Sequence, residues 1–127
     1  MRTEGTPVKE YKMPVKRYVQ TMSLKDNPEL IKAYRKAHSE PEMWKEIMEG
    51  IHQVGILEME IYILGNQLVM IVEAPMDFDW DSSMAKLATL PRQEEWERHV
   101  SSFQDCNEND TSDEKWKMME RMFHLYK

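Results

Sequence analysis

A tyrosine and a histidine are the first residues in the sequence whose spacing suits chemistry. Tyr34 and His38 are four positions apart, and residues at that spacing share one face of a helix. Histidine titrates near neutrality, so it can give or take a proton at physiological pH. The pair is compatible with acid–base catalysis by His38, although the pattern alone is more typical of a histidine packed in a core or an interface.

Two further aromatic residues could contact a hydroxyl-rich ligand. Trp96 offers a flat surface on which a sugar ring could stack, although a tryptophan on an amphipathic helix more often belongs to the core. Tyr62 could hydrogen-bond a hydroxyl group, or it could be a strand aromatic at a subunit contact. The acidic and aromatic run 77–81 could supply paired carboxylates, but helix capping explains it equally well.

Other catalytic chemistries lack the motifs they need. Cys106 is the one cysteine, and its acidic neighbours argue against a reactive thiolate. Glycine-rich phosphate loops are absent from the sequence. The histidines lack the close helical spacing of a metal-binding pair; they are His38, His52, His99 and His124. The sequence therefore predicts neither a metal nor a cofactor.

The first elements that would position Tyr34 and His38 are a strand and a helix. Residues 15–24 alternate loosely and are rich in β-branched and aromatic side chains, which predicts a strand. Asn27 is a good N-cap and Pro28 suits the first helical position, so a helix is expected through His38. Pro41 then interrupts the helix, because proline lacks an amide donor.

A second helical segment and a hairpin follow. Residues 43–54 carry an apolar helical stripe, and Gly55 is expected to end that helix. Two apolar runs, 56–64 and 67–73, flank Gly65-Asn66, which predicts a hairpin with a tight turn. Alternation in the first strand should place Met59, Ile61 and Ile63 on one face and Glu58, Glu60 and Tyr62 on the other.

The last third of the chain should hold two helices and a final strand. Residues 76–90 predict a short helix or a turn and a helix. Pro91 is expected to open the helix that carries Trp96. The acidic stretch 105–114 has five acidic side chains without Lys or Arg, and we interpret it as a solvated connection. Residues 115–126 could be a helix or a strand, and their alternation slightly favours a strand.

This order of elements predicts an α+β fold of the ferredoxin-like type, βαββαβ. Its four-stranded antiparallel sheet would have helices on one face, and a second copy of the chain could cover the other. We therefore expect a homodimer, a dimeric α/β barrel. Residues 1–13 read as a flexible N-terminal extension, and residues 14–127 as a single domain.

Composition excludes several partners. The chain has 127 residues and a net charge of −6, of which the acidic stretch supplies five, so the remainder is nearly neutral. It lacks the basic stripe expected for nucleic-acid binding and any apolar run long enough to span a membrane. No secretion signal is visible at its start. A cytoplasmic location is expected, and one cysteine fits that compartment.

Four segments together resemble the L-rhamnose mutarotase family. They are KRYVQTMSLKDNPELIKAYRKAH, GILEMEIYILGNQLVMIVEA, LATLPRQEEWE and KWKMMERMFHLY. The resemblance implies a small dimeric enzyme without a metal, in which His38 is the proton donor and Tyr34 contacts the sugar. It also implies that Trp96 and Glu95 occupy the positions of a pocket-lining aromatic pair. Met59 stands where the rhamnose enzymes have a sugar-contacting tyrosine.

The implied reaction is interconversion of the α and β anomers of a 6-deoxy-L-hexose, L-rhamnose or L-fucose. MEIYILGN and DFDW look more like the L-fucose subgroup. The partner of His38 could be Glu60, Glu95 or a bound water. Two other functions occur on this fold and stay open: a haem-linked monooxygenase, and a non-catalytic dimeric binding or stress protein.

Overall fold

The computed structural model describes residues 4–107 and 110–126, so the first three residues of the predicted N-terminal extension lie outside it. The described residues form nine helices and strands in the order β1 (Val15–Ser23), α1 (Pro28–Ala37), α2 (Lys45–Gln53), β2 (Glu58–Leu64), β3 (Gln67–Pro75), α3 (Trp80–Leu87), α4 (Gln93–Ser101), α5 (Ser112–Lys115) and β4 (Lys117–Met119).

The four strands form one antiparallel sheet in the order β2-β3-β1-β4. β1 and β3 are the central pair, in register from Val15 opposite Pro75 to Ser23 opposite Gln67. β2 returns along β3 through the turn at Gly65, whose φ of +61° suits glycine. This arrangement confirms the predicted ferredoxin-like α+β fold and the predicted hairpin.

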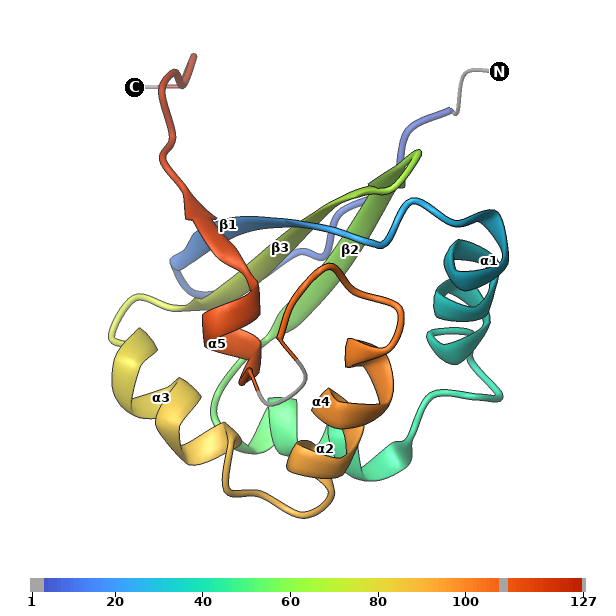
Figure 1. Ribbon diagram of the computed structural model, residues 1–127. Helices are drawn as coiled ribbons and strands as arrows, with labels where there is room; N and C mark the ends of the chain where they lie inside the picture. Colours follow the sequence, from blue (N-terminus) through green and yellow to red (C-terminus); the bar gives the residue numbers. More distant parts are fainter. Residues whose placement is uncertain (1–3, 108–109, 127) are drawn as a thin grey trace.

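The helices cover one face of the sheet, and the core lies between the two layers (Figure 1). Alternate residues of β3 point into this core and are almost completely buried; they are Leu68, Met70, Val72 and Ala74. Met59, Ile61 and Ile63 of β2 pack against the same core, as the alternation predicted. The candidate site therefore lies between this face of the sheet and the helices that cover it.

The opposite face of the sheet is not covered by helices (Figure 1). Residues 4–14 contain no helix or strand, but Tyr11 donates a hydrogen bond to Glu73 on this face. Arg17 also binds Glu73, at 2.7 Å. Although burial raises the pKa of Glu73, the hydrogen bonds from Arg17 and Tyr11 hold it below its usual value. These contacts anchor the N-terminal segment at its Tyr11 end.

Two helices begin where the sequence predicted, and a third does not. Asn27 accepts hydrogen bonds from the Glu29 and Leu30 amides, and Asp79 caps α3. The prediction that Pro91 opens the next helix is wrong, because α4 begins at Gln93. Arg92 precedes it with a φ of +63°, so the chain makes a left-handed turn before the helix starts.

The C-terminal third differs most from the sequence prediction. The described part of the acidic stretch contains the start of α5, which is stabilised by a capping box between Thr111 and Glu114. The strand expected within residues 115–126 has only three residues, Lys117–Met119. A helix therefore replaces the end of the expected connection, and residues 120–126 of the expected final strand contain neither helix nor strand. Within the described ranges, none of the helices has the length and apolar character needed to cross a membrane.

Candidate active site

Tyr34, His38 and Trp96 come together around one small internal cavity, although they lie on two helices far apart in sequence. The His38 ring centroid is 4.3 Å from that of Tyr34 and 5.3 Å from that of Trp96. The cavity, which we call the inner cavity, has a volume of about 70 Å³ and also contacts Gln93, Glu97 and Gln104. Three of the residues selected from the sequence therefore form one cluster between α1, α4 and the sheet.

His38 is held by its own helix. It caps the C-terminus of α1, and its Nδ1 lies 3.0 Å from the Tyr34 carbonyl oxygen. A carbonyl oxygen can only accept, so Nδ1 carries the hydrogen and Nε2 is left to exchange a proton. Burial lowers the pKa of His38 despite the hydrogen bond to Tyr34, and the nearby His99 lowers it further. The neutral ring is favoured, and its protonated form is a stronger acid than ordinary histidine.

Tyr34 packs against the ring of His38. Its side chain is buried, and its ring meets the edge of Phe103 at 6.4 Å. Burial raises the pKa of Tyr34, which a hydrogen bond with Gln104 opposes and the charge of Glu97 reinforces. The phenol therefore stays neutral and can act only as a hydrogen-bonding and packing group.

A larger cavity, the His38 cavity, adjoins the inner one and is open at the surface. Its volume is about 360 Å³, within the range of small-molecule sites. His38, His52 and Glu58 supply its titratable side chains. The rest of the wall is almost entirely apolar: Met43, Met48, Ile51, Ile56, Leu57, Met59 and Ile61. An apolar pocket with a few polar groups is the usual form of a ligand site.

Tyr62 and Glu95, also selected from the sequence, lie outside both cavities. Tyr62 is on the uncovered sheet face, where its hydroxyl donates to Glu60 at 3.2 Å. Glu95 is exposed on α4 and binds Arg92 through both carboxylate oxygens. The hydrogen bond from Arg92 holds the pKa of Glu95 below its usual value. Glu60 also belongs to the uncovered face, so two predicted partners of His38 point elsewhere.

An aromatic cluster beside Trp96 was not predicted as part of the site. Trp44 stacks on His99 at 5.5 Å with an interplanar angle of 14°, and it meets Trp96 at 5.2 Å. The Arg92 guanidinium lies 4.0 Å from the Trp44 ring centroid. The three-residue spacing of Trp96 and His99 was a signal for this contact, because it places both on one helix face. Trp44 gave no such signal, since it lies on a different segment.

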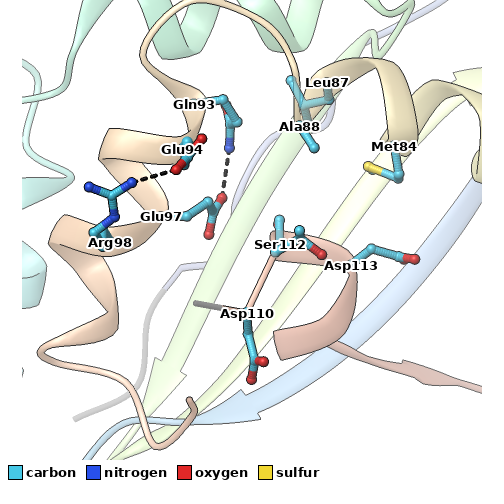
Figure 2. Close-up of a pocket in the computed structure, with 11 residues that line it drawn as sticks. Met84, Leu87, Ala88, Gln93, Glu94, Glu97, Arg98, Asp110, Ser112 and Asp113 are labelled. Atoms are coloured by element: carbon cyan, nitrogen blue, oxygen red, sulfur yellow. Dashed lines mark hydrogen bonds and ion pairs between the residues drawn. The ribbon is translucent and has the colours of Figure 1, made fainter. Parts of the chain in front are cut away.

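A third cavity, the α3–α5 cavity, is lined by residues of α3, α4 and α5 and of the chain before α5 (Figure 2). Its volume is about 340 Å³. Gln93 points toward Glu97 and donates to it at 2.6 Å, and Lys115 donates to the other carboxylate oxygen of Glu97 at 2.8 Å. Lys115 is completely buried. This buried ion pair was not predicted, because the pattern of residues 115–126 gave no sign that Lys115 is buried.

No group of three or more histidine, cysteine or acidic side chains is arranged to hold a metal ion in residues 4–107 and 110–126. The chemistry that the His38 cavity can support with its own residues is proton transfer, from an imidazole with one exchangeable nitrogen. An apolar cavity of this size, with an acid–base residue in its wall, is suited to isomerising a small neutral molecule.

The comparison with protein families agrees with this class. The L-rhamnose mutarotase family model matches residues 17–125, which includes His38 and every element of the sheet. The chain belongs to the L-rhamnose mutarotase family. It is therefore an aldose mutarotase, an isomerase of sugars.

Two curated relatives cover most of the chain. It is 33% identical over 113 residues to the L-fucose mutarotase of Xanthomonas campestris pv. campestris, which covers 89% of this chain and 90% of that protein. It is 36% identical over 115 residues to a UPF0734 protein of Dictyostelium discoideum, covering 87% and 90%. The crystal structure of an L-rhamnose mutarotase from Formosa agariphila superposes with a TM-score of 0.65 at 19% identity, covering 87% of this chain and 99% of that one. This likeness supports the fold.

Proposed function

We propose that this protein interconverts the α and β anomers of a 6-deoxy-L-hexose, with His38 as the proton donor. The observation that carries the proposal is the placement of His38, with its Nε2 directed away from the Tyr34 carbonyl, in the wall of an open apolar cavity. In the ring-opening step, protonated His38 gives its proton to the ring oxygen as the bond to the anomeric carbon breaks. Reclosure on the other face of the aldehyde returns that proton.

The apolar wall supports a deoxy sugar over a fully hydroxylated one. Methionine and isoleucine side chains make up most of the His38 cavity, and they would leave a C6 hydroxyl without a hydrogen-bond partner. A C6 methyl group loses nothing in that environment, whereas an unpaired hydroxyl costs about 1–3 kcal/mol. Met59 is one of these side chains, so the strand contributes an apolar contact at the position where the rhamnose enzymes have tyrosine.

Saturation transfer between the α and β anomer signals in NMR spectra tests the reaction. L-rhamnose, L-fucose and L-galactose, the C6-hydroxylated counterpart of L-fucose, form the comparison. We expect faster anomer exchange with one or both deoxy sugars and little acceleration with L-galactose. If purified protein accelerated none of the three sugars, the proposed function would be wrong.

Replacing His38 tests the proposed role of its side chain. His38→Gln keeps a polar group of similar size but cannot donate a proton from a cationic ring, so we expect exchange to slow by about 10²–10⁴-fold. The thermal unfolding temperature should stay close to that of the unmodified chain. Arg35→Gln, on the exposed side of the same helix, is the control and should exchange normally. Unchanged exchange in His38→Gln would remove His38 from the mechanism.

We propose also that the enzyme works as a homodimer. The chain after β4 projects away from the helices (Figure 1), and four of its large hydrophobic side chains are exposed: Met122 at 95%, Phe123 at 71%, Leu125 at 83% and Tyr126 at 88%. The sheet face without helices exposes Tyr62 and half-exposes Val19, Val69 and Ile71. One chain therefore has two apolar surfaces without partners, and a second copy related by a two-fold axis could cover both.

Light scattering during size-exclusion chromatography tests the dimer. We expect the mass of two chains for the unmodified protein and of one chain after Phe123→Asp combined with Leu125→Asp. The chain's own fold should survive, because both side chains are exposed in one copy. Met76→Asp changes an exposed methionine beyond β3 and serves as the control. A monomeric unmodified protein at micromolar concentration would rule the dimer out. The cytoplasmic location stays a prediction.

A further inference from the structure

We propose that Glu58 is the second catalytic residue, the carboxylate that takes the proton from the anomeric hydroxyl while His38 protonates the ring oxygen. This inference rests on the proposed anomer exchange and adds to it the group that the sequence left unidentified. Glu58 supplies the only carboxyl group in the wall of the His38 cavity, among the residues that the structure describes. It lies at the start of β2, and His38, at the end of α1, lines the same cavity.

The position of the Glu58 side chain follows from its place on an edge strand. β2 has one neighbouring strand, β3, so alternate amides on its outer side have no strand partner. The Met59 amide donates instead to Oε1 of Glu58, at 2.9 Å. This hydrogen bond holds the carboxylate beside the outer edge of β2, next to the Met59 amide. The other carboxylate oxygen, Oε2, has no hydrogen-bond partner within residues 4–107 and 110–126.

The two carboxylates that the sequence suggested as partners of His38 form hydrogen bonds outside the His38 cavity. Glu60 accepts a hydrogen bond from Tyr62 on the uncovered sheet face. Both oxygens of Glu95 bind Arg92 on the exposed side of α4. His52 is the one other titratable residue in the described wall of the His38 cavity, and it is exposed at the end of α2. Glu58 combines a fixed carboxylate, an oxygen without a protein partner and a position at the cavity.

The proton balance of the reaction fits one carboxylate and one imidazole. The step needs Glu58 as the carboxylate and His38 as the imidazolium, which its lowered pKa makes the less populated but more acidic form. Glu58 takes the proton of the anomeric hydroxyl as the carbonyl double bond forms, and the electron pair of the breaking carbon–oxygen bond goes to the ring oxygen, which receives the His38 proton. The open aldehyde then lies between a protonated Glu58 and a neutral His38. Rotation about the bond to the anomeric carbon and reclosure return both protons.

Glu58→Gln is the substitution that isolates this role. Its side-chain carbonyl can still accept from the Met59 amide, so the edge of β2 should keep its structure, but an amide does not take up a proton near neutrality. We expect kcat for L-fucose or L-rhamnose exchange to fall by about 10²-fold, with a smaller change in KM. Glu49→Gln, an exposed glutamate on α2, is the control.

Variants of other titratable residues test whether the catalytic carboxylate is Glu58. Glu60→Gln should retain most of the exchange rate. Full activity in Glu58→Gln would overturn the inference, as would a loss of activity in Glu60→Gln that equalled or exceeded its own. Failure of the proposed function looks different, because then the unmodified protein would accelerate no sugar. If His38→Gln abolishes exchange and Glu58→Gln leaves it intact, the function stands and the role of Glu58 falls.

Discussion

The His38 cavity and the α3–α5 cavity differ in how their polar groups are satisfied. In the His38 cavity, Nε2 of His38 and Oε2 of Glu58 have no hydrogen-bond partner among the described residues, and the surrounding wall is apolar. In the α3–α5 cavity, Glu97 binds Gln93 and the buried Lys115 through its two carboxylate oxygens. The cavities have nearly equal volumes, about 360 and 340 Å³, so size does not separate them.

This difference separates catalysis from structural stability. A polar group without a protein partner is free to bind a substrate hydroxyl, whereas a buried charge is tolerated only when it is paired. Glu97 and Lys115 hold α5 against α4, and α5 in turn positions β4 at the edge of the sheet. This contrast supports the proposal that the reaction takes place in the His38 cavity, whereas the Glu97–Lys115 pair stabilises the fold.

Breaking the buried pair should have the largest effect on stability. Lys115→Met leaves the Glu97 carboxylate without its cation, and we expect a loss of about 3–5 kcal/mol in the free energy of unfolding. Urea denaturation measures it. Lys45→Met, which removes the exposed pair with Glu49, should cost about 0–1 kcal/mol. Adding Glu97→Leu to Lys115→Met should recover much of the loss, since no charge is then left buried. Equal effects of the two lysine substitutions would contradict the comparison.

Tyr34→Phe should have an intermediate effect, because Tyr34 belongs to the side with catalytic groups but is itself satisfied. The change removes the hydrogen bond with Gln104, which is also buried. An unsatisfied buried amide costs about 1–3 kcal/mol, so unfolding should become easier by that amount. Chemical denaturation and anomer exchange measured on the same sample separate the two roles. A variant as stable as the unmodified chain would show that Gln104 finds another partner.

Local patterns predicted most of the fold. The Asn27 cap, the break at Pro41, the Gly65-Asn66 turn and the alternation along β2 each depend on a few adjacent residues, so they could be read from the sequence. The structure places Tyr34, His38 and Trp96, which the family resemblance selected, around one cavity. What the sequence missed depends on contacts between distant segments. Lys115 is buried only because Glu97, eighteen positions earlier, pairs with it.

The hydrogen bond of Glu58 shows the same limit within the site. Strand alternation places Glu58 on the face of Glu60 and Tyr62, and it does not say what the carboxylate binds. The alternation does not include the free outer edge of β2, where the Met59 amide attracts the carboxylate. Edge position is a property of the strand order, and no pattern within residues 58–64 contains it. The proposed role of Glu58 could therefore not be predicted from the sequence.

The smallest expected effect is the pH dependence that His38 gives to stability. Burial holds its pKa below the unfolded value, so the unfolded chain binds more protons as the pH falls through about 6.5. Stability should be greatest above that pH and decrease on acidification until the folded ring also protonates. One group limits the slope to about 1.4 kcal/mol per pH unit. Urea unfolding at fixed protein concentration between pH 5 and pH 8 measures it. His38→Gln should remove this component, while Lys45→Met should keep it. An unchanged pH dependence in His38→Gln would mean that the ring is as well solvated in the folded chain as in the unfolded one, and the contrast between the two cavities would lose its electrostatic basis.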